Sequence, residues 1–177
     1  MRVIKHIVFL LLVPAVSYAQ TVHVDEDRIV YKGTVTIANV DKEELYERAK
    51  ESIRNKVKKT KDNIAKDNKQ NGMIAVKGKI KLSTPYHLIR KVEYLLELSA
   101  DDGSYKYRID SVYINQAERG RKKTKISSEE LLKGMEVSGP TSANTEKQLN
   151  EIDINFQKLL VLVNNDMKKT AVVKNPE

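Results

Sequence analysis

The stretch 73–98 constrains the fold most, because two runs within it alternate between apolar and charged residues with a period of two. A period of two predicts β-strands, since successive side chains of a strand point to opposite faces of its sheet. A turn at 83–85 joins the runs, so they form an antiparallel hairpin. The sheet is therefore expected to have one apolar face that must be covered and one charged face that tolerates water.

Further elements extend this hairpin into a single α+β domain over 29–168. The other expected strands are 29–37, 64–67 and 105–116. One helix is expected after the N-cap Asp41, and a long helix after Thr145. Each helix carries one apolar stripe at helical spacing, so both are expected to cover the same sheet face and to leave the charged face open.

The last expected strand changes phase partway along. Its apolar residues up to Ile109 share one face, whereas Val112 and Ile114 fall on the other. A bulge near 110–111 would return both residues to the core, and this is the favoured register. Without the bulge, Tyr113 would point inward, so the register over 109–114 stays open at this stage.

Residues 1–19 have the three-part pattern of a secretory signal peptide, with basic residues, an apolar run and a small-x-small site ending at Ala19. The apolar run is shorter than the roughly 20 residues of a spanning helix, so we expect cleavage and a periplasmic or secreted product without a transmembrane segment. Removing Arg2 and Lys5 takes the formal net charge from +8 to +6. Residues 20–28 are expected to form a flexible leader, and 169–177 a flexible tail.

The chain offers no pattern of catalytic or metal-binding residues. It contains no cysteine, so an exported product would be held together by its core alone. Outside the signal, His23 and His87 lie in a leader and a turn without a nucleophile or carboxylate at a recognisable spacing. Gly-x-Ser-x-Gly, His-Glu-x-x-His and phosphate-loop motifs are absent from the sequence. No cofactor is expected, and a non-enzymatic role is favoured.

Several short motifs carry a family resemblance. They are DKEELYERA at 41–49, DNI at 62–64, DNKQNGMI at 67–74, KGK at 77–79 and DDGSYKYR at 101–108. Together they resemble a family of secreted bacterial domains of unknown function with a TATA-box-binding-protein-like (TBP-like) fold. The resemblance covers about 29–168 and implies the order strand, helix, four strands, helix. The chain departs from the family in lacking a large aromatic near Ser52 and in its more basic segment at 117–127.

Two groups of basic residues are candidate binding sites for anions. The first projects from the open sheet face and comprises Lys32, Lys77, Lys79, Lys81, Lys91, Lys106 and Arg108. The second is a basic loop within 117–144 and comprises Arg119, Arg121, Lys122, Lys123 and Lys125. Clustered positive charge attracts phosphate and carboxylate groups, but it is also common on ordinary wet surfaces, where exposed ion pairs are weak.

These observations predict an exported cell-envelope module that binds a partner through its open cationic sheet face. The expected partners are an envelope protein, an anionic lipid or a polysaccharide. Nucleic acid is not expected, because fold does not determine function and the chain is predicted to be exported. One alternative is an assembly protein that pairs through an edge strand, and another is an unrecognised enzyme.

Overall fold

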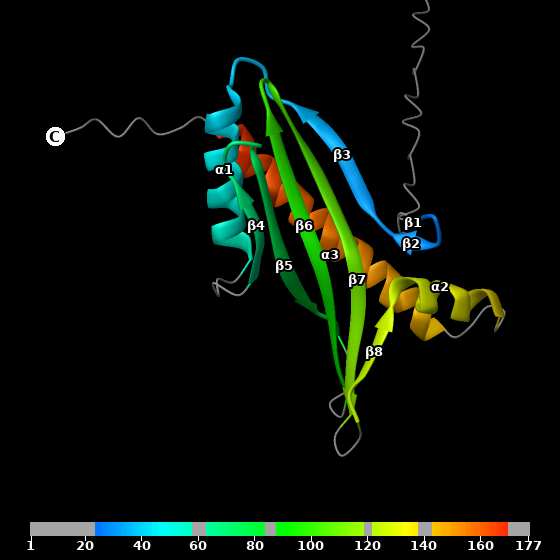
Figure 1. Ribbon diagram of the computed structural model, residues 1–177. Helices are drawn as coiled ribbons and strands as arrows, with labels where there is room; N and C mark the ends of the chain where they lie inside the picture. The colour runs from blue at the N-terminus through cyan, green and yellow to red at the C-terminus, as the bar shows by residue number, and fades with distance from the viewer. Residues whose placement is uncertain (1–23, 58–62, 84–87, 119–121, 138–142, 170–177) are drawn as a thin grey trace, which may run out of the picture.

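The computed structural model describes residues 24–57, 63–83, 88–118, 122–137 and 143–169 (Figure 1). The strands are β1 (Val24–Asp25), β2 (Arg28–Ile29), β3 (Tyr31–Thr36), β4 (Ile64–Asn68), β5 (Met73–Lys81), β6 (Leu88–Asp101), β7 (Ser104–Glu118) and β8 (Thr124–Ser127). The helices are α1 (Lys42–Lys56), α2 (Ser128–Val137) and α3 (Ala143–Lys168). The predicted signal peptide, the start of the leader and residues 170–177 lie outside the described residues.

The fold is α+β, with a six-stranded antiparallel sheet in the order β3-β7-β6-β5-β4 and with β8 also paired to β7. β3 and β8 lie end to end along the same edge of β7, because β3 pairs with residues 104–109 and β8 with residues 113–116. Figure 1 shows α3 crossing one face of the sheet, beside α1. The other face carries no helix among the described residues, so the predicted fold class is confirmed.

Both predicted apolar stripes form the core. The α1 stripe, Leu45, Ala49, Ile53 and Val57, is buried, and so are most members of the α3 stripe. Phe156 of α3 sits at the centre, fully buried, with its ring edge-on to the rings of Tyr31 at 5.2 Å and Tyr94 at 5.1 Å. Helix α3 therefore joins the edge strand β3 to the central strand β6 through one aromatic cluster.

The start of α1 is confirmed and that of α3 is not. Oδ1 of Asp41 accepts a hydrogen bond from the Glu44 backbone N–H at 2.8 Å, as expected of an N-cap. Helix α3 instead begins at Ala143, so Thr145 lies inside its first turn and the prediction of an N-cap there was wrong. Ser, Thr and Asn occur at several neighbouring positions in this segment, and each is an acceptable cap by residue type.

The favoured bulge in β7 is confirmed. Glu93 pairs with Tyr113 and Leu95 with Asp110, so two residues of β7 lie opposite the single residue between Glu93 and Leu95. Ser111, within the bulge, adopts the left-handed backbone conformation, with a φ of 51°. Val112 and Ile114 are buried as a result, each with 2% exposure, whereas Tyr113 is 37% exposed.

The end of the predicted leader is structured. β1 and β2 form a two-stranded hairpin whose turn residues Glu26 and Asp27 have φ of 49° and 59°. Two positive φ values define a turn that Asn-Gly or Gly-Gly would normally signal. Glu-Asp gives no such signal, so the prediction of a flexible leader over 20–28 was wrong for residues 24–28.

The predicted basic loop at 117–144 also contains regular structure, namely β8 and α2. α2 begins with a capping box in which the Ser127 hydroxyl accepts from the Glu130 N–H at 3.2 Å and the Glu130 carboxylate accepts from the Ser127 N–H at 2.8 Å. The prediction was wrong about β8 because alternation over four residues is too short to stand out, and the strand is identified by its pairing with the end of the preceding strand β7. None of the described helices is long and apolar enough to cross a membrane.

Two buried tyrosines predict how stability responds to high pH. Burial raises the pKa of Tyr94 to about 12, and burial followed by nearby Tyr107 raises the pKa of Tyr105 to about 12. A raised pKa in the folded state stabilises the protein below the ordinary value of 10.0, and this contribution is lost as pH rises from 10 through 12. We expect ultraviolet titration to show Tyr94 and Tyr105 among the tyrosines that ionise late, together with unfolding. Tyr94→Phe should remove one late step, and ionisation of all tyrosines near pH 10 in the folded protein would contradict the expectation.

Candidate functional site

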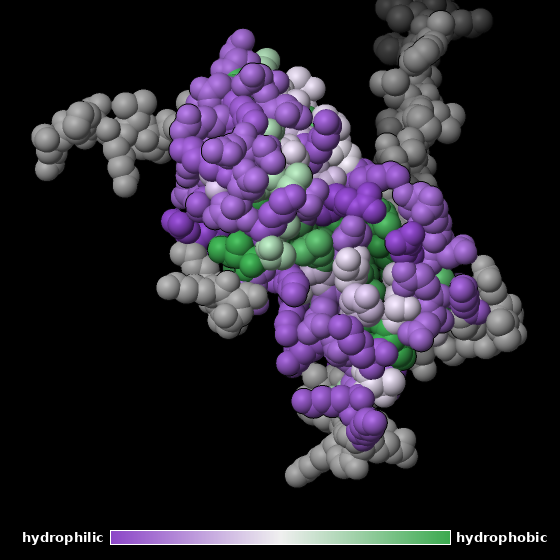
Figure 2. Space-filling view, viewed as in Figure 1, coloured by the Kyte–Doolittle hydropathy of each residue, from purple (hydrophilic) through white to green (hydrophobic). Residues whose placement is uncertain are grey.

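The strand register places all seven predicted basic residues of the sheet on its open face. Cross-strand partners share a face, and the register pairs Lys32 with Arg108, Lys79 with Glu93 and Lys81 with Lys91. All seven side chains are exposed. Figure 2 shows this face largely covered by hydrophilic residues and crossed by a narrow hydrophobic band.

Acidic side chains neutralise one part of the face. Lys32 forms an ion pair with Asp25 of the β1–β2 hairpin, which lowers the pKa of the Asp25 carboxyl through a hydrogen bond and charge attraction. Lys106 Nζ lies 3.5 Å from an Asp101 carboxylate oxygen. Arg108 Nε donates to Asp110 at 2.6 Å, which raises the pKa of the guanidinium. In this part of the face, Lys32, Lys106 and Arg108 therefore already have anionic partners.

The other part of the face keeps unpaired positive charge. Among the residues that the structure describes, Lys77, Lys81 and Lys91 form no ion pair within 4.0 Å. Lys81 and Lys91 are direct cross-strand partners, so two like charges face each other on one side of the sheet. Such an arrangement destabilises the pair of strands unless an anion lies between the charges.

β8 adds the second predicted group to this part of the face. Lys125 is the cross-strand partner of Asn115, and Asn115 is the partner of Lys91. Lys125 Nζ lies 4.1 Å from the centre of the Tyr113 ring, a cation–π contact, and 3.7 Å from a Glu93 carboxylate oxygen. The sheet face and the basic loop, predicted as two sites, therefore meet at one end of the sheet.

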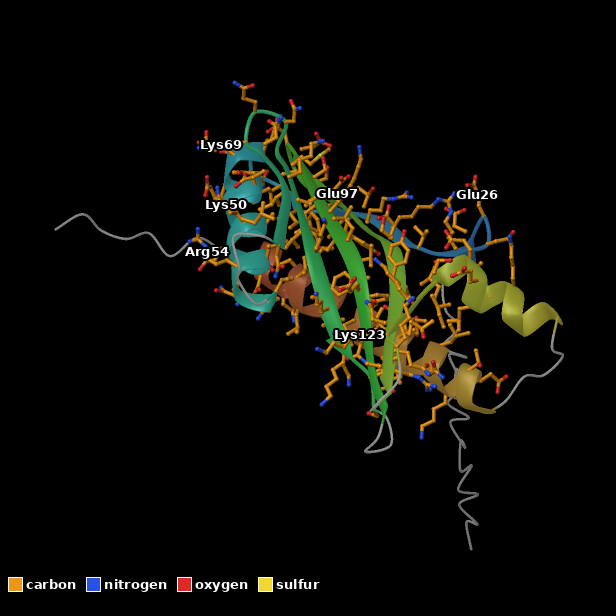
Figure 3. The ribbon with its side chains drawn as sticks, turned by 60° about the horizontal axis from the view of Figure 1, so that its bottom comes forward. Glu26, Lys50, Arg54, Lys69, Glu97 and Lys123 are labelled. Carbon is orange, nitrogen blue, oxygen red and sulfur yellow. The ribbon has the colours of Figure 1, made fainter. Side chains whose placement is uncertain are left out.

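We call this surface the basic sheet end. It comprises Lys77, Lys79, Lys81 and Lys91 of the hairpin β5–β6 and Lys125 of β8, and Lys122 and Lys123 precede β8 in the sequence. Figure 3 shows Lys123 at the end of the sheet remote from Lys69. Arg119 and Arg121 lie outside the described residues.

Glu93 is the one acidic side chain that the described strands place inside the basic sheet end. It bridges two lysines, with Lys79 Nζ at 2.9 Å and Lys125 Nζ at 3.7 Å. The hydrogen bond from Lys79 is the main cause of the lowered pKa of its carboxyl. Glu93 is thus satisfied internally, and it orients Lys79 and Lys125 without neutralising the other lysines.

A polar cavity of about 120 Å³ lies beside the β7 bulge, and β2 and the start of α2 also line it. Its charged lining pairs internally, since Arg108 contacts Asp110 and Arg28 lies 3.8 Å from Glu129. No group of three or more His, Cys, Asp or Glu side chains in the described part of the chain is placed to hold a metal ion. His23 and His87 lie outside that part.

Comparison with known proteins relates the sequence to a domain family and to solved structures. The model of a family described as a domain of unknown function (DUF4468) with TBP-like fold matches residues 31–115. A TBP-like protein from Parabacteroides distasonis aligns with a TM-score of 0.70 and 16% identity over 84% of this chain and 98% of that chain. A DUF4468 family protein from Bacteroides ovatus aligns with a TM-score of 0.64 and 14% identity over 90% of this chain and 95% of that chain. At these identities the two structures show the fold alone, and no curated protein matches the chain.

Proposed function

This chain belongs to the DUF4468 family of domains with a TBP-like fold, and we propose that it is a non-enzymatic binding module that holds anionic partners at the basic sheet end. The observation that carries the proposal is the unpaired charge of Lys77, Lys81 and Lys91, three exposed lysines on neighbouring strands. Elsewhere on the same face, Lys32, Lys106 and Arg108 each have an acidic partner within 4.0 Å.

The proposal includes a location and a class of partner. The signal pattern at 1–19 supports an exported protein, for which anionic phospholipid headgroups and acidic polysaccharides are available partners. Both present repeated phosphate, sulfate or carboxylate groups to an exposed set of lysines. Because the lysines are exposed, the attraction is expected to weaken steeply with salt, since the screening length is about 8 Å at physiological ionic strength.

Two triple variants with the same charge change test the proposal. We expect Lys77→Gln, Lys81→Gln and Lys91→Gln together to elute from heparin at clearly lower salt than the unmodified protein, and to lose co-sedimentation with phosphatidylglycerol vesicles. The matched control, Lys32→Gln, Lys106→Gln and Arg108→Gln, removes three charges that already have acidic partners. It should shift elution much less.

The two probes separate the partner classes. Retention on heparin alone favours a polysaccharide, and co-sedimentation with vesicles alone favours lipid. Equal shifts in the two triple variants would mean that only net charge matters, and failure of the unmodified protein to bind either probe at physiological salt would remove the proposal. The melting temperature of the first variant should not fall below that of the unmodified protein, because the substitutions remove the repulsion between Lys81 and Lys91.

A further inference from the structure

The free edge of β3 is the longest unpaired strand edge in the described part of the chain. β7 pairs with all six residues of β3 on one side, and no described strand pairs with the other side. The Ile37 N–H donates to the Gly103 C=O at 2.8 Å, which fixes the phase of the ladder. Residues in phase with Ile37 bond to β7, so Lys32, Thr34 and Thr36 turn their backbone N–H and C=O groups towards the free side.

We infer that two copies of this chain pair through their β3 strands, antiparallel, with Thr34 on the twofold axis. In this register Thr34 faces Thr34 of the second copy, and Lys32 faces Thr36 of the second copy at each end. All three outward residues then form hydrogen-bonded pairs with two N–H···O=C bonds each. The two sheets would become one continuous sheet with its two open faces on the same side.

Charge favours a second copy at this edge. No lysine opposes a lysine in the register, and Lys32 is already paired with Asp25 of its own chain. The opposite edge of the sheet is built differently, because β4 covers β5 only as far as Val76 and the edge carries Lys66, Lys79 and Lys81. Lysines along an edge strand oppose pairing between sheets. The chain therefore protects one edge with charge and leaves the other self-complementary.

The helix layer beneath β3 also presents apolar surface. Asp153 and Asn164 of α3 accept hydrogen bonds from Tyr31 at 2.7 Å and Tyr105 at 3.4 Å, so the flank of α3 that carries them faces the strands β3 and β7. Leu160 lies one helical turn before Asn164 on this flank and is half-buried, and the next residue, Val161, is 57% exposed. Together with the half-buried Val35 of β3, these side chains give a second copy apolar surface to cover.

This inference is independent of the proposed function, since it uses the edge of the sheet away from Lys79 and Lys81. An experiment can therefore disprove dimerisation through β3 without disproving the binding of anions at the basic sheet end, and the reverse also holds.

Single cysteines test the register, because the chain contains no cysteine of its own. Residues that face each other in a hydrogen-bonded antiparallel pair have Cα atoms about 5.5 Å apart, within the range that a disulfide spans. We expect Thr34→Cys to give a cross-linked dimer under mild oxidation at low protein concentration. Thr36→Cys is the matched control, exposed on the same face of the same strand, and should stay uncross-linked because it faces Lys32 of the second copy. Equal cross-linking of the two variants, or none in either, would overturn the register.

Light scattering provides a measurement that does not depend on oxidation. The unmodified chain should have the mass of a dimer, and Thr34→Lys and Thr34→Glu should each be monomeric because like charges then meet on the twofold axis. Mixing these two variants should restore the dimer. Lys66→Glu, on the opposite edge, should leave the mass unchanged. A monomeric unmodified chain, or a dimer that survives in Thr34→Lys, would overturn the inference.

Discussion

Phe156→Ala is expected to lower the free energy of unfolding by about 3–5 kcal/mol. Phe156 has 0% exposure, and its ring meets both Tyr31 and Tyr94 edge-on. The substitution removes the contact through which α3 holds the edge strand and the centre of the sheet together. It also leaves a cavity that two tyrosine rings on different strands cannot easily fill, because each ring is fixed to its own strand.

Leu162→Ala is the matched control for this prediction. Leu162 lies on the same helix, is a large apolar residue and is 45% exposed. Its truncation should change the free energy of unfolding by no more than about 0.5 kcal/mol. Urea denaturation followed by circular dichroism measures both variants. Similar losses for the two would show that the centre of the core is not at Phe156.

The parts of the fold that were predictable are those in which burial follows a fixed period. In β5, β6, α1 and α3, the spacing of the apolar residues within the element itself shows which of its faces is buried in the core. The bulge at Ser111 was predictable for the same reason, because a phase change in the apolar pattern needs one extra residue. The β1–β2 hairpin was missed because its turn, Glu26-Asp27, takes positive φ without a glycine or an asparagine.

The candidate site was predictable in part. The side-chain period of a strand placed the lysines on one face, but it does not say which of them meet an acid. Asp25 comes from the hairpin that was missed, and Asp110 precedes the bulge, so both ion pairs depend on backbone geometry outside the regular strands. Lys125 joined the site through pairing of β8 with β7. The alternation Thr124-Lys125-Ile126-Ser127 before a capping box was the available signal.

Two glycines on the covered face each lie beneath a tyrosine ring from the neighbouring strand. Gly78 pairs with Tyr94, and Gly33 pairs with Tyr107. A Cβ on Gly78 would lie 2.1 Å from Cζ of Tyr94, and a Cβ on Gly33 would lie 2.6 Å from Oη of Tyr107. Carbon atoms need well over 3 Å, so in each case the ring must move.

The two sites differ in whether the ring is free to move, and this difference predicts the larger effect at Gly78. Tyr94 is 6% exposed and packs on Phe156, whereas the ring of Tyr107 is half-buried and is able to turn towards water. Gly78→Ala is therefore expected to cost about 2 kcal/mol, in the range for overpacking a rigid core. Gly33→Ala should cost clearly less, because the ring of Tyr107 has to move a shorter distance and because alanine lowers the entropy of the unfolded chain.

Chemical denaturation measures the free energy of unfolding of both variants. A cost at Gly33 equal to that at Gly78 would mean that contact with the ring, rather than the packing behind it, sets the penalty. In the double variant Gly78→Ala with Tyr94→Leu, the loss attributable to Gly78 should largely disappear, since the atoms that the new Cβ would meet are gone.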